Sequence, residues 1–173
     1  MVKISDNQNE IFDIVDEKDN VIETVTRGEV HKNKKLIHRS VSVAIFNKKG
    51  ELFLQKRSGN KDMDPLKWTI SCSGHVASGD SYEMTAHREL VEELGIDLEI
   101  LPITKYICKE PYETEMVMLY KAVSNGPFKL NPNEIVRGKF FSRKKLNKEI
   151  KSGSIDLNFS VKVVLEKLGW VDF

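Results

Sequence analysis

Short runs in which apolar and polar residues alternate mark the first half of the chain. Two of them, at 11–15 and 21–25, flank the polar stretch 16–20. Alternation over four to eight residues, bounded by turn-forming residues, is typical of β-strands. The pattern therefore predicts a β-hairpin with a longer loop.

A second pair of runs follows at 41–46 and 51–55, around the turn sequence Asn47-Lys48-Lys49-Gly50. Val41, Val43 and Ile45 alternate with smaller residues, as expected of a half-buried strand. The polar segment 58–66 predicts a loop, and 67–76 is expected to be extended.

The clearest helical pattern follows Gly79. Asp80 is the expected N-cap, and Glu83, three residues later, would complete an arrangement like a capping box. Gly95 is expected to end the helix as a C′ glycine. The apolar positions expected to face the core are Met84, Leu90, Val91 and Leu94.

The remaining sequence predicts further strands at 98–108, 116–123 and 136–142, then helices near 143–151 and 159–168. Strands, a central helix, more strands and terminal helices together predict an α+β sandwich. No internal repeat or low-complexity linker interrupts the 173 residues, so one domain over 1–173 is expected, with a flexible N-terminus at 1–10.

The composition, with 40% apolar and 31% charged residues, is ordinary for a soluble globular protein. A net charge of +1 favours neither nucleic acid nor a membrane surface, and Arg143-Lys144-Lys145 is interpreted as a solvated helix face. The N-terminal segment lacks the apolar run of a signal peptide, and no segment approaches the roughly 20 apolar residues of a membrane span. Cys72 and Cys108 do not make a disulfide framework. A cytoplasmic protein, monomeric or homodimeric, is expected.

One dense motif changes this picture: Gly74, five residues, Asp80, seven residues, and then Arg88-Glu89-Leu90-Val91-Glu92-Glu93-Leu94-Gly95-Ile96. Glu89, Glu92 and Glu93 are spaced i, i+3 and i+4, so a helix places all three on one face. Like charges at this spacing destabilise a bare helix. A hard divalent cation, Mg²⁺ or Mn²⁺, would offset the repulsion and is commonly shared with a substrate's phosphates.

The motif resembles the Nudix box, G-x5-E-x7-R-E-U-x-E-E-x-G-U with U aliphatic, except that Asp80 stands at the first Glu. The resemblance implies a mixed β-sheet between α-helices. It also implies a metal-dependent hydrolase that cleaves a small-molecule diphosphate linked to another moiety, most simply a nucleoside diphosphate derivative. Its metal ligands would be Glu89, Glu92 and Glu93.

The mechanism expected from this resemblance assigns distinct roles to the charged groups. Glu92, Glu93 or a downstream acid such as Glu134 would accept a proton from the attacking water. Arg88 would orient the helix carboxylates, with Asp80 as its partner. A domain that binds a diphosphate without cleaving it is the alternative, which the complete carboxylate set disfavours.

Three positions before the helix are candidates for substrate binding. Gly74 would let the backbone approach closely, although a simple turn glycine fits the sequence equally well. Lys56 and Arg57 could contact phosphate or could be a solvated basic pair, and Lys61 is a weaker candidate. The aromatic residues Trp68, Phe140 and Phe141 are assigned to packing.

Residues outside the box resemble the branch of the superfamily that includes isopentenyl-diphosphate isomerase. In that family a divalent metal is bound by two upstream histidines, the histidine after the box glycine and a Glu-x-Glu pair. The matching residues imply a possible second metal site at His31, His38, His75, Glu113 and Glu115. The alternative is that they anchor loops without binding metal.

The isomerase chemistry itself is not matched. Ser73 stands where the isomerase has its catalytic cysteine, and Cys72 is expected to face away from the pocket because adjacent residues of a strand point to opposite faces. The stretch 158–162 offers no tryptophan to stabilise a carbocation. A hydrolase is therefore favoured over an isomerase.

Overall fold

The computed structural model describes residues 7–171, so part of the segment expected to be flexible, residues 1–6, lies outside the described residues. The strands and helices are β1 (Ile11–Val15), β2 (Val21–Thr26), α1 (Arg27–Val30), β3 (Ile37–Phe46), β4 (Leu52–Arg57), β5 (Trp68–Thr69), β6 (Cys72–His75), α2 (Tyr82–Leu94), β7 (Leu101–Lys109), β8 (Thr114–Val123), β9 (Ile135–Phe141), α3 (Arg143–Lys151) and α4 (Phe159–Lys167). The expected hairpin is confirmed as the antiparallel pair β1–β2.

The strand β3 organises the sheet. It pairs in parallel with β8 along its whole length, and its other edge is shared in succession by β1, β6 and β4, all antiparallel to it. Residues 40–45 are buried although small and large side chains alternate there, because helices cover both faces of the sheet. The half-buried strand expected from the alternation is thus a fully buried central strand.

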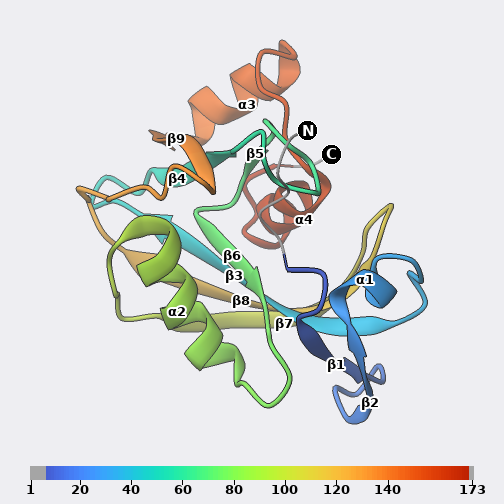
Figure 1. Ribbon diagram of the computed structural model, residues 1–173. Helices are drawn as coiled ribbons and strands as arrows, with labels where there is room; N and C mark the ends of the chain where they lie inside the picture. Colours follow the sequence, from blue (N-terminus) through green and yellow to red (C-terminus); the bar gives the residue numbers. More distant parts are fainter. Residues whose placement is uncertain (1–6, 172–173) are drawn as a thin grey trace.

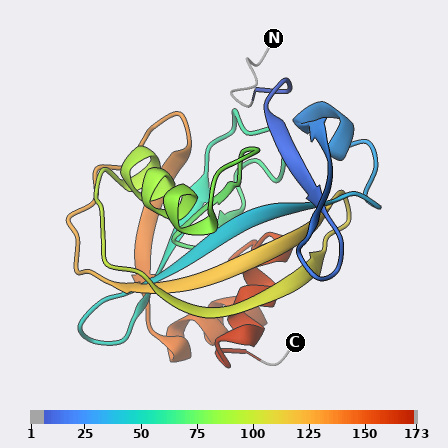
Figure 2. The same cartoon turned by 90° about the horizontal axis from the view of Figure 1, so that it is seen from below.

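The mixed sheet lies between α2 on one face and α3 with α4 on the other (Figures 1 and 2), which confirms the predicted fold class. Under α2, Leu90 and Leu94 pack on Val43 and Ile45. On the opposite face, α4 packs into a core of buried side chains from several elements: Leu52, Leu54, Trp68, Phe141, Leu146, Val161 and Leu165. Trp68, Phe140 and Phe141 pack as expected.

Helix α2 differs from the expectation at its start and on its apolar face. Its N-cap is Ser81 rather than Asp80, because the Asp80 N–H bonds to the Ala77 carbonyl and closes a turn before the helix begins. Gly95, with φ +64°, ends the helix as predicted. The prediction that Met84 and Val91 face the core is wrong: they are 63% and 53% exposed.

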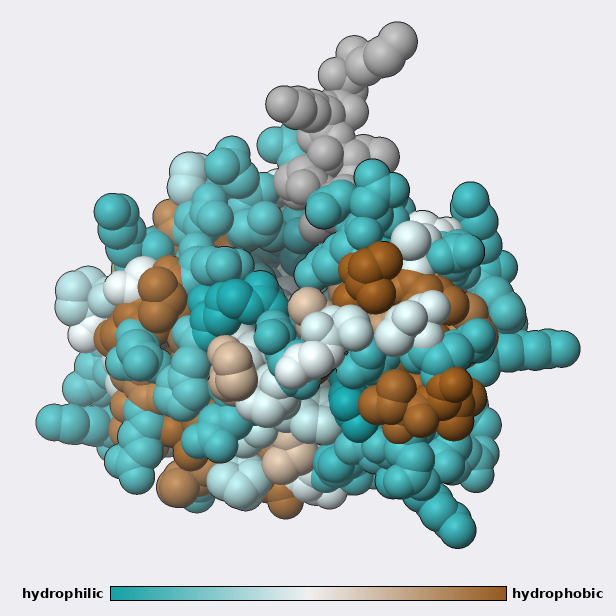
Figure 3. Space-filling view, turned by 60° about the horizontal axis from the view of Figure 1, so that its bottom comes forward, coloured by the Kyte–Doolittle hydropathy of each residue, from teal (hydrophilic) through white to brown (hydrophobic). Residues whose placement is uncertain are grey.

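Met84 and Val91 are exposed because other residues occupy the inner side of α2. Leu90 and Leu94 bury the apolar stripe, and the neighbouring edge carries buried carboxylates that face a pocket. The remaining apolar residues of the helix, Met84 and Val91, therefore lie on the outer face of α2. On the face shown in Figure 3, apolar side chains form separate patches within a mostly hydrophilic surface. Within residues 7–171, no helix has the length and apolar character that crossing a membrane requires.

Candidate active site

A pocket of about 410 Å³ lies where α2, β3, β6 and the start of β8 meet the loop after β4. Small residues form part of its wall: Ser42 of β3 lies opposite Ser73 of β6, and Gly74 lies opposite Val41. Their short side chains leave room between the strands and α2. Most of the other lining residues carry charged or amide groups, so the pocket suits a polar, charged ligand.

The three carboxylates of α2 all line this pocket. Glu93 is 7% exposed, and the side chain of Glu89 is 13% exposed, whereas that of Glu92 is 56% exposed. Their placement follows from the helical spacing seen in the sequence. Two of the three carboxylates have therefore lost most of their hydration.

Arg88 lies at the solvent edge of this group. Its Nη1 is 3.0 Å from Oε1 of Glu89 and 3.6 Å from Oε2 of Glu92, and Nη2 donates a hydrogen bond to the His75 carbonyl. The arginine therefore orients two of the carboxylates, as the sequence predicted. The expected pair with Asp80 is not formed, because Arg88 is directed along α2 and toward β6 instead.

Gly74 approaches Glu89 closely. A Cβ at position 74 would lie 2.3 Å from Cδ of Glu89, far inside van der Waals contact. A side chain at position 74 would therefore move the Glu89 carboxylate from its observed place, while a substrate-binding role of Gly74 stays a prediction.

A Gly74→Ala substitution is therefore expected to displace Glu89 and to lower kcat/KM by about 10²-fold, since small displacements at a catalytic site have effects of this size. Steady-state kinetics would measure this. The matched control is Gly59→Ala, whose new Cβ would meet only Leu66 Cδ2 at 3.7 Å. Equal activity of the two variants would contradict this interpretation of Gly74.

Burial governs the ionisation of the inner carboxylates. Burial raises the pKa of Glu89 to about 8, and the neighbouring Glu93 carboxylate adds to the increase. Burial also raises the pKa of Glu93 to about 7, against a hydrogen bond that Gln55 donates to Oε2 over 2.7 Å. Two desolvated carboxylates side by side form a donor set of hard oxygens, which fits a divalent cation.

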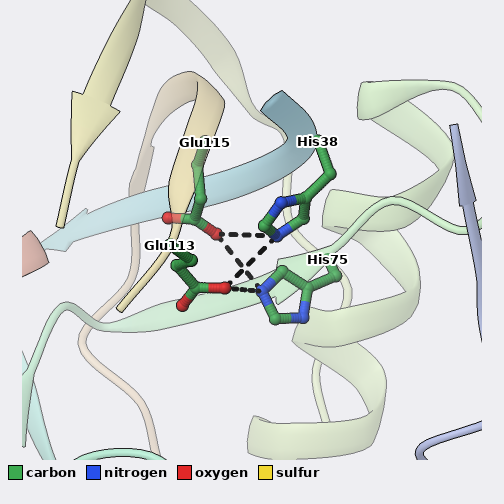
Figure 4. Close-up of side chains that lie close together, drawn as sticks. All are labelled: His38, His75, Glu113 and Glu115. Atoms are coloured by element: carbon green, nitrogen blue, oxygen red, sulfur yellow. Dashed lines mark ion pairs between the residues drawn. The ribbon is translucent and has the colours of Figure 1, made fainter. Parts of the chain in front are cut away.

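Four side chains that could hold a metal ion form a second group, and three of them, His75, Glu113 and Glu115, also line the pocket (Figure 4). His38 extends from β3, His75 from the end of β6, Glu115 from β8, and Glu113 from just before β8. One ligand atom from each lies within 4.8 Å of the other three. The parallel register that places His38 beside Glu115 assembles this group from distant parts of the sequence.

His31, the C-cap of α1 and the fifth residue implied by the resemblance, contacts Glu113 but lies outside this group of four. Its Nε2 lies 3.1 Å from Oε2 of Glu113, which is also 3.3 Å from Nε2 of His38 and 3.6 Å from Nε2 of His75. Nε2 of His38 and Oε2 of Glu113 are buried, yet neither makes a hydrogen bond of normal geometry. Converging, unsatisfied nitrogen and oxygen atoms fit a transition-metal ion or zinc.

The charged side chains of this second group lie close enough together to shift one another's pKa. Burial opposes ionisation of Glu113, but the close contacts of its carboxylate with the three histidines hold its pKa well below the usual range. Burial lowers the pKa of His38. Burial also acts to lower the pKa of His75, but its contacts with Glu113 and Glu115 outweigh this effect and raise the pKa to about 9.

Arg27 of α1 is a member of the site that sequence reasoning missed. Its Nη1 lies 2.7 Å from Nδ1 of His75, so Nε2 is the ring nitrogen turned toward the carboxylates. Its Nη2 forms an ion pair with Asp62 over 3.2 Å, which ties α1 to the loop after β4. The four-residue helix α1 lacked the apolar periodicity that would have revealed it.

The candidate phosphate-binding residues divide between two faces of β4. Arg57 lines the pocket and donates from Nε to the Met63 carbonyl, whereas Lys56 does not line it. Lys61 also lines the pocket and forms an ion pair with Glu134 over 2.7 Å. Of the three candidates, Arg57 and Lys61 therefore lie where they could meet an anionic ligand in the pocket.

Ser73 and Cys72 occupy opposite sides of β6. Ser73 lines the pocket, while Cys72 is fully buried beneath α2, where burial raises the pKa of its thiol and the Glu93 carboxylate accepts its hydrogen bond. The pocket thus presents a hydroxyl group, and not a thiol, at this position of β6.

Comparisons with known proteins agree with this geometry. A family model described as the NUDIX domain matches residues 36–159. An uncharacterized Nudix hydrolase of Pseudomonas aeruginosa is 33% identical over 132 residues, which cover 76% of this chain and 78% of that protein. The crystal structure of DR0079 from Deinococcus radiodurans is similar with a TM-score of 0.80 and 25% identity, covering 91% of this chain and 98% of that one.

The isomerase branch also appears among the relatives. Isopentenyl-diphosphate Delta-isomerase 2 of Photorhabdus laumondii is 38% identical over 99 residues, or 57% of this chain. The match spans only 55% of the length of that isomerase.

Proposed function

Because this chain belongs to the Nudix family, we propose that it is a metal-dependent hydrolase that cleaves a diphosphate linked to another moiety. The observation that carries the proposal is the pair of buried carboxylates, Glu89 and Glu93, in a polar pocket. Their raised pKa values mark a site that stabilises negative charge poorly without a cation. The pair favours hydrolysis, because a domain that only bound a diphosphate would need no site that activates water.

A bound Mg²⁺ or Mn²⁺ would neutralise charge on the diphosphate and make a water molecule acidic enough to attack at neutral pH. Glu89, Glu92 and Glu93 would hold the cation, and Arg88 keeps the first two in place through its ion pairs. Glu93 would accept the proton of the attacking water, because its carboxylate lines the pocket beside those of Glu89 and Glu92.

Arg57 and Lys61 would bind the phosphate oxygens, because they are the cations on the β4 side of the pocket. Lys61 is already paired with Glu134, so binding of a phosphate would compete with that ion pair. Glu134 remains the alternative base if this competition releases its carboxylate into the pocket.

We propose a nucleoside diphosphate derivative as the substrate class. Asn131, Asn158 and Ser160 accompany the charged groups of the pocket and offer hydrogen bonds to a polar group. A prenyl chain would find few apolar side chains there. The polar lining therefore favours a nucleoside over an isoprenoid.

We propose that a second metal ion binds to the histidines and carboxylates near the start of β8, namely His31, His38, His75, Glu113 and Glu115. The unsatisfied buried atoms of His38 and Glu113 support this assignment. Its ligand set would suit zinc or manganese better than magnesium.

Isomerisation of isopentenyl diphosphate is the second candidate function, favoured by the isomerases among the relatives. Ser73 lines the pocket where a thiol would be needed, and Cys72 is buried behind it against Glu93. For this reason hydrolysis remains the proposal.

The test is product analysis with Mg²⁺ or Mn²⁺ across nucleoside di- and triphosphates, sugar nucleotides, coenzyme A and isopentenyl diphosphate. We expect cleavage of a nucleoside diphosphate derivative that is lost in Glu92→Gln or Glu93→Gln. Binding without any cleavage would favour the binding module. Conversion of isopentenyl diphosphate without phosphate release would favour the isomerase.

A further inference from the structure

Gln55 stands out as a buried polar residue in an otherwise apolar part of a strand. It follows Leu52-Phe53-Leu54 in β4 and is 2% exposed. A buried side-chain amide is costly unless its hydrogen bonds are formed. The contacts of this amide therefore indicate why the position is polar.

The amide nitrogen of Gln55 makes two contacts. It donates to the Ser71 carbonyl over 3.2 Å and to Oε2 of Glu93 over 2.7 Å. The Ser71 side chain is itself fixed, because its hydroxyl donates to the Phe53 carbonyl and accepts from the Ile45 N–H. The amide is thus held by the sheet and directed at the carboxylate of α2.

Glu93 has few other groups that stabilise its charge, although the Arg57 guanidinium favours the ionised carboxylate from a distance. No ion pair among the described residues includes its carboxylate, and its other hydrogen-bond partner is the weakly donating thiol of Cys72. The amide therefore supplies the strong hydrogen bond that links the helix carboxylate to the sheet.

We propose that Gln55 is the positioning residue for Glu93: its amide holds Oε2, so that the carboxylate stays ordered at the pocket wall and ready to receive a metal ion. This inference rests on the proposed function, because it assumes that Glu93 serves the metal site of α2. Hydrogen-bonding partners of metal ligands commonly change metal affinity by 10–100-fold when removed.

The test is a titration of the purified protein with Mn²⁺. Electron paramagnetic resonance measures the concentration of free Mn²⁺ and hence the amount bound. Mn²⁺ binding that is lost in Glu93→Gln is assigned to the α2 carboxylates. Binding that remains in this variant is subtracted as the contribution of other sites. Gln55→Met keeps the length of the side chain and removes the amide. It is expected to weaken Mn²⁺ binding at the α2 site by about tenfold or more.

Two further variants separate positioning from general disruption. Gln55→Asn keeps an amide but shortens its reach, so it should weaken Mn²⁺ binding as Gln55→Met does. Thr85→Val is the matched control, because Thr85 is a buried polar residue of α2 whose hydroxyl has no hydrogen-bond partner in the described structure. It should leave Mn²⁺ affinity unchanged.

A double variant completes the test: in a Glu93→Gln background, Gln55→Met should cause no further loss. Wild-type affinity in both Gln55 variants would overturn the role of Gln55 while leaving the hydrolase proposal intact. Mn²⁺ binding that is insensitive to Glu93→Gln would instead overturn the proposed metal site itself. Thermal unfolding of each variant without metal shows whether a loss of affinity reflects a loss of folding.

Discussion

A Glu89→Gln protein is expected to lose activity by about 100-fold or more and yet to be more stable than the wild type at pH 8 without metal. The loss follows from removing a charged ligand from the metal site. The gain follows from burial, which raises the pKa of Glu89 from 4.5 to about 8. An amide at this position cannot ionise, so it avoids the cost of a buried charge.

The direction of the pH effect follows from proton linkage. Between pH 4.5 and about 8 the folded protein holds a proton on Glu89 that the unfolded chain has released. The free energy of unfolding therefore falls as pH rises through this window, and the contribution of Glu89 is fully favourable only below it. Glu89→Gln removes the titrating carboxyl group. The free energy of unfolding of the variant should therefore fall less than that of the wild type as pH rises through this window.

Thermal unfolding in EDTA at pH 5 and pH 8 would measure the effect. The two proteins should have similar Tm values at pH 5, and the variant should exceed the wild type at pH 8, by a difference on the order of 5 °C. Glu92→Gln, on the same helix but largely exposed, should leave Tm unchanged. A variant less stable than the wild type at pH 8 would contradict the assigned burial of Glu89.

The second large effect is expected at Glu113. Its carboxylate lies within ion-pair distance of three histidines, namely His31, His38 and His75. Removing one member of a buried charged group typically costs several kcal/mol, because the partners lose their compensation. Glu113→Gln should therefore lower the free energy of unfolding at pH 7 by about 3 kcal/mol, a fall in Tm of about 10 °C.

The pH dependence of this loss can also be predicted. The depressed pKa of Glu113 contributes stability above pH 4.5, and the raised pKa of His75 contributes stability that is fully present below pH 6.5 and lost as pH rises through about 9. The difference in Tm between the wild type and Glu113→Gln should therefore be largest between about pH 5 and pH 6.5.

Metal binding at this group gives the same variant a second readout. Zn²⁺ or Mn²⁺ should raise the Tm of the wild type and have a smaller effect on Glu113→Gln. Glu110→Gln is the matched control, since Glu110 is also buried beside the pocket but burial raises its pKa to about 8, so its charge is not needed for stability. Equal Tm values in the wild type and Glu113→Gln would show that the contacts between Glu113 and the histidines do not contribute to stability.

Much of the α2 part of the site could be predicted from the sequence, because the relevant residues are close together in the chain. The spacing of Glu89, Glu92 and Glu93 places them on one helix edge whatever the rest of the fold does. Gly95 ended the helix as expected because only a local positive φ was required. The N-cap was misplaced by one residue, since the turn at Ala77 could not be read from composition.

The parts that could not be predicted depend on pairing between distant strands. The parallel register of β3 and β8 sets His38 beside Glu115, and no local pattern specifies it. The roles of Gln55 and Arg27 likewise arise from contacts with residues far away in the sequence, Glu93 and His75. One indication in the sequence that Gln55 is unusual is its polar side chain directly after the apolar run Leu52-Phe53-Leu54.

The most direct test of the account is the Mg²⁺ dependence of product release from whichever diphosphate the substrate survey identifies. Wild-type protein stripped with EDTA should be inactive, and activity should rise with added Mg²⁺ to a plateau that Glu93→Gln does not reach. Cleavage that persists in EDTA, or that Glu93→Gln leaves unchanged, would contradict the assignment of the α2 carboxylates as the metal site of a hydrolase.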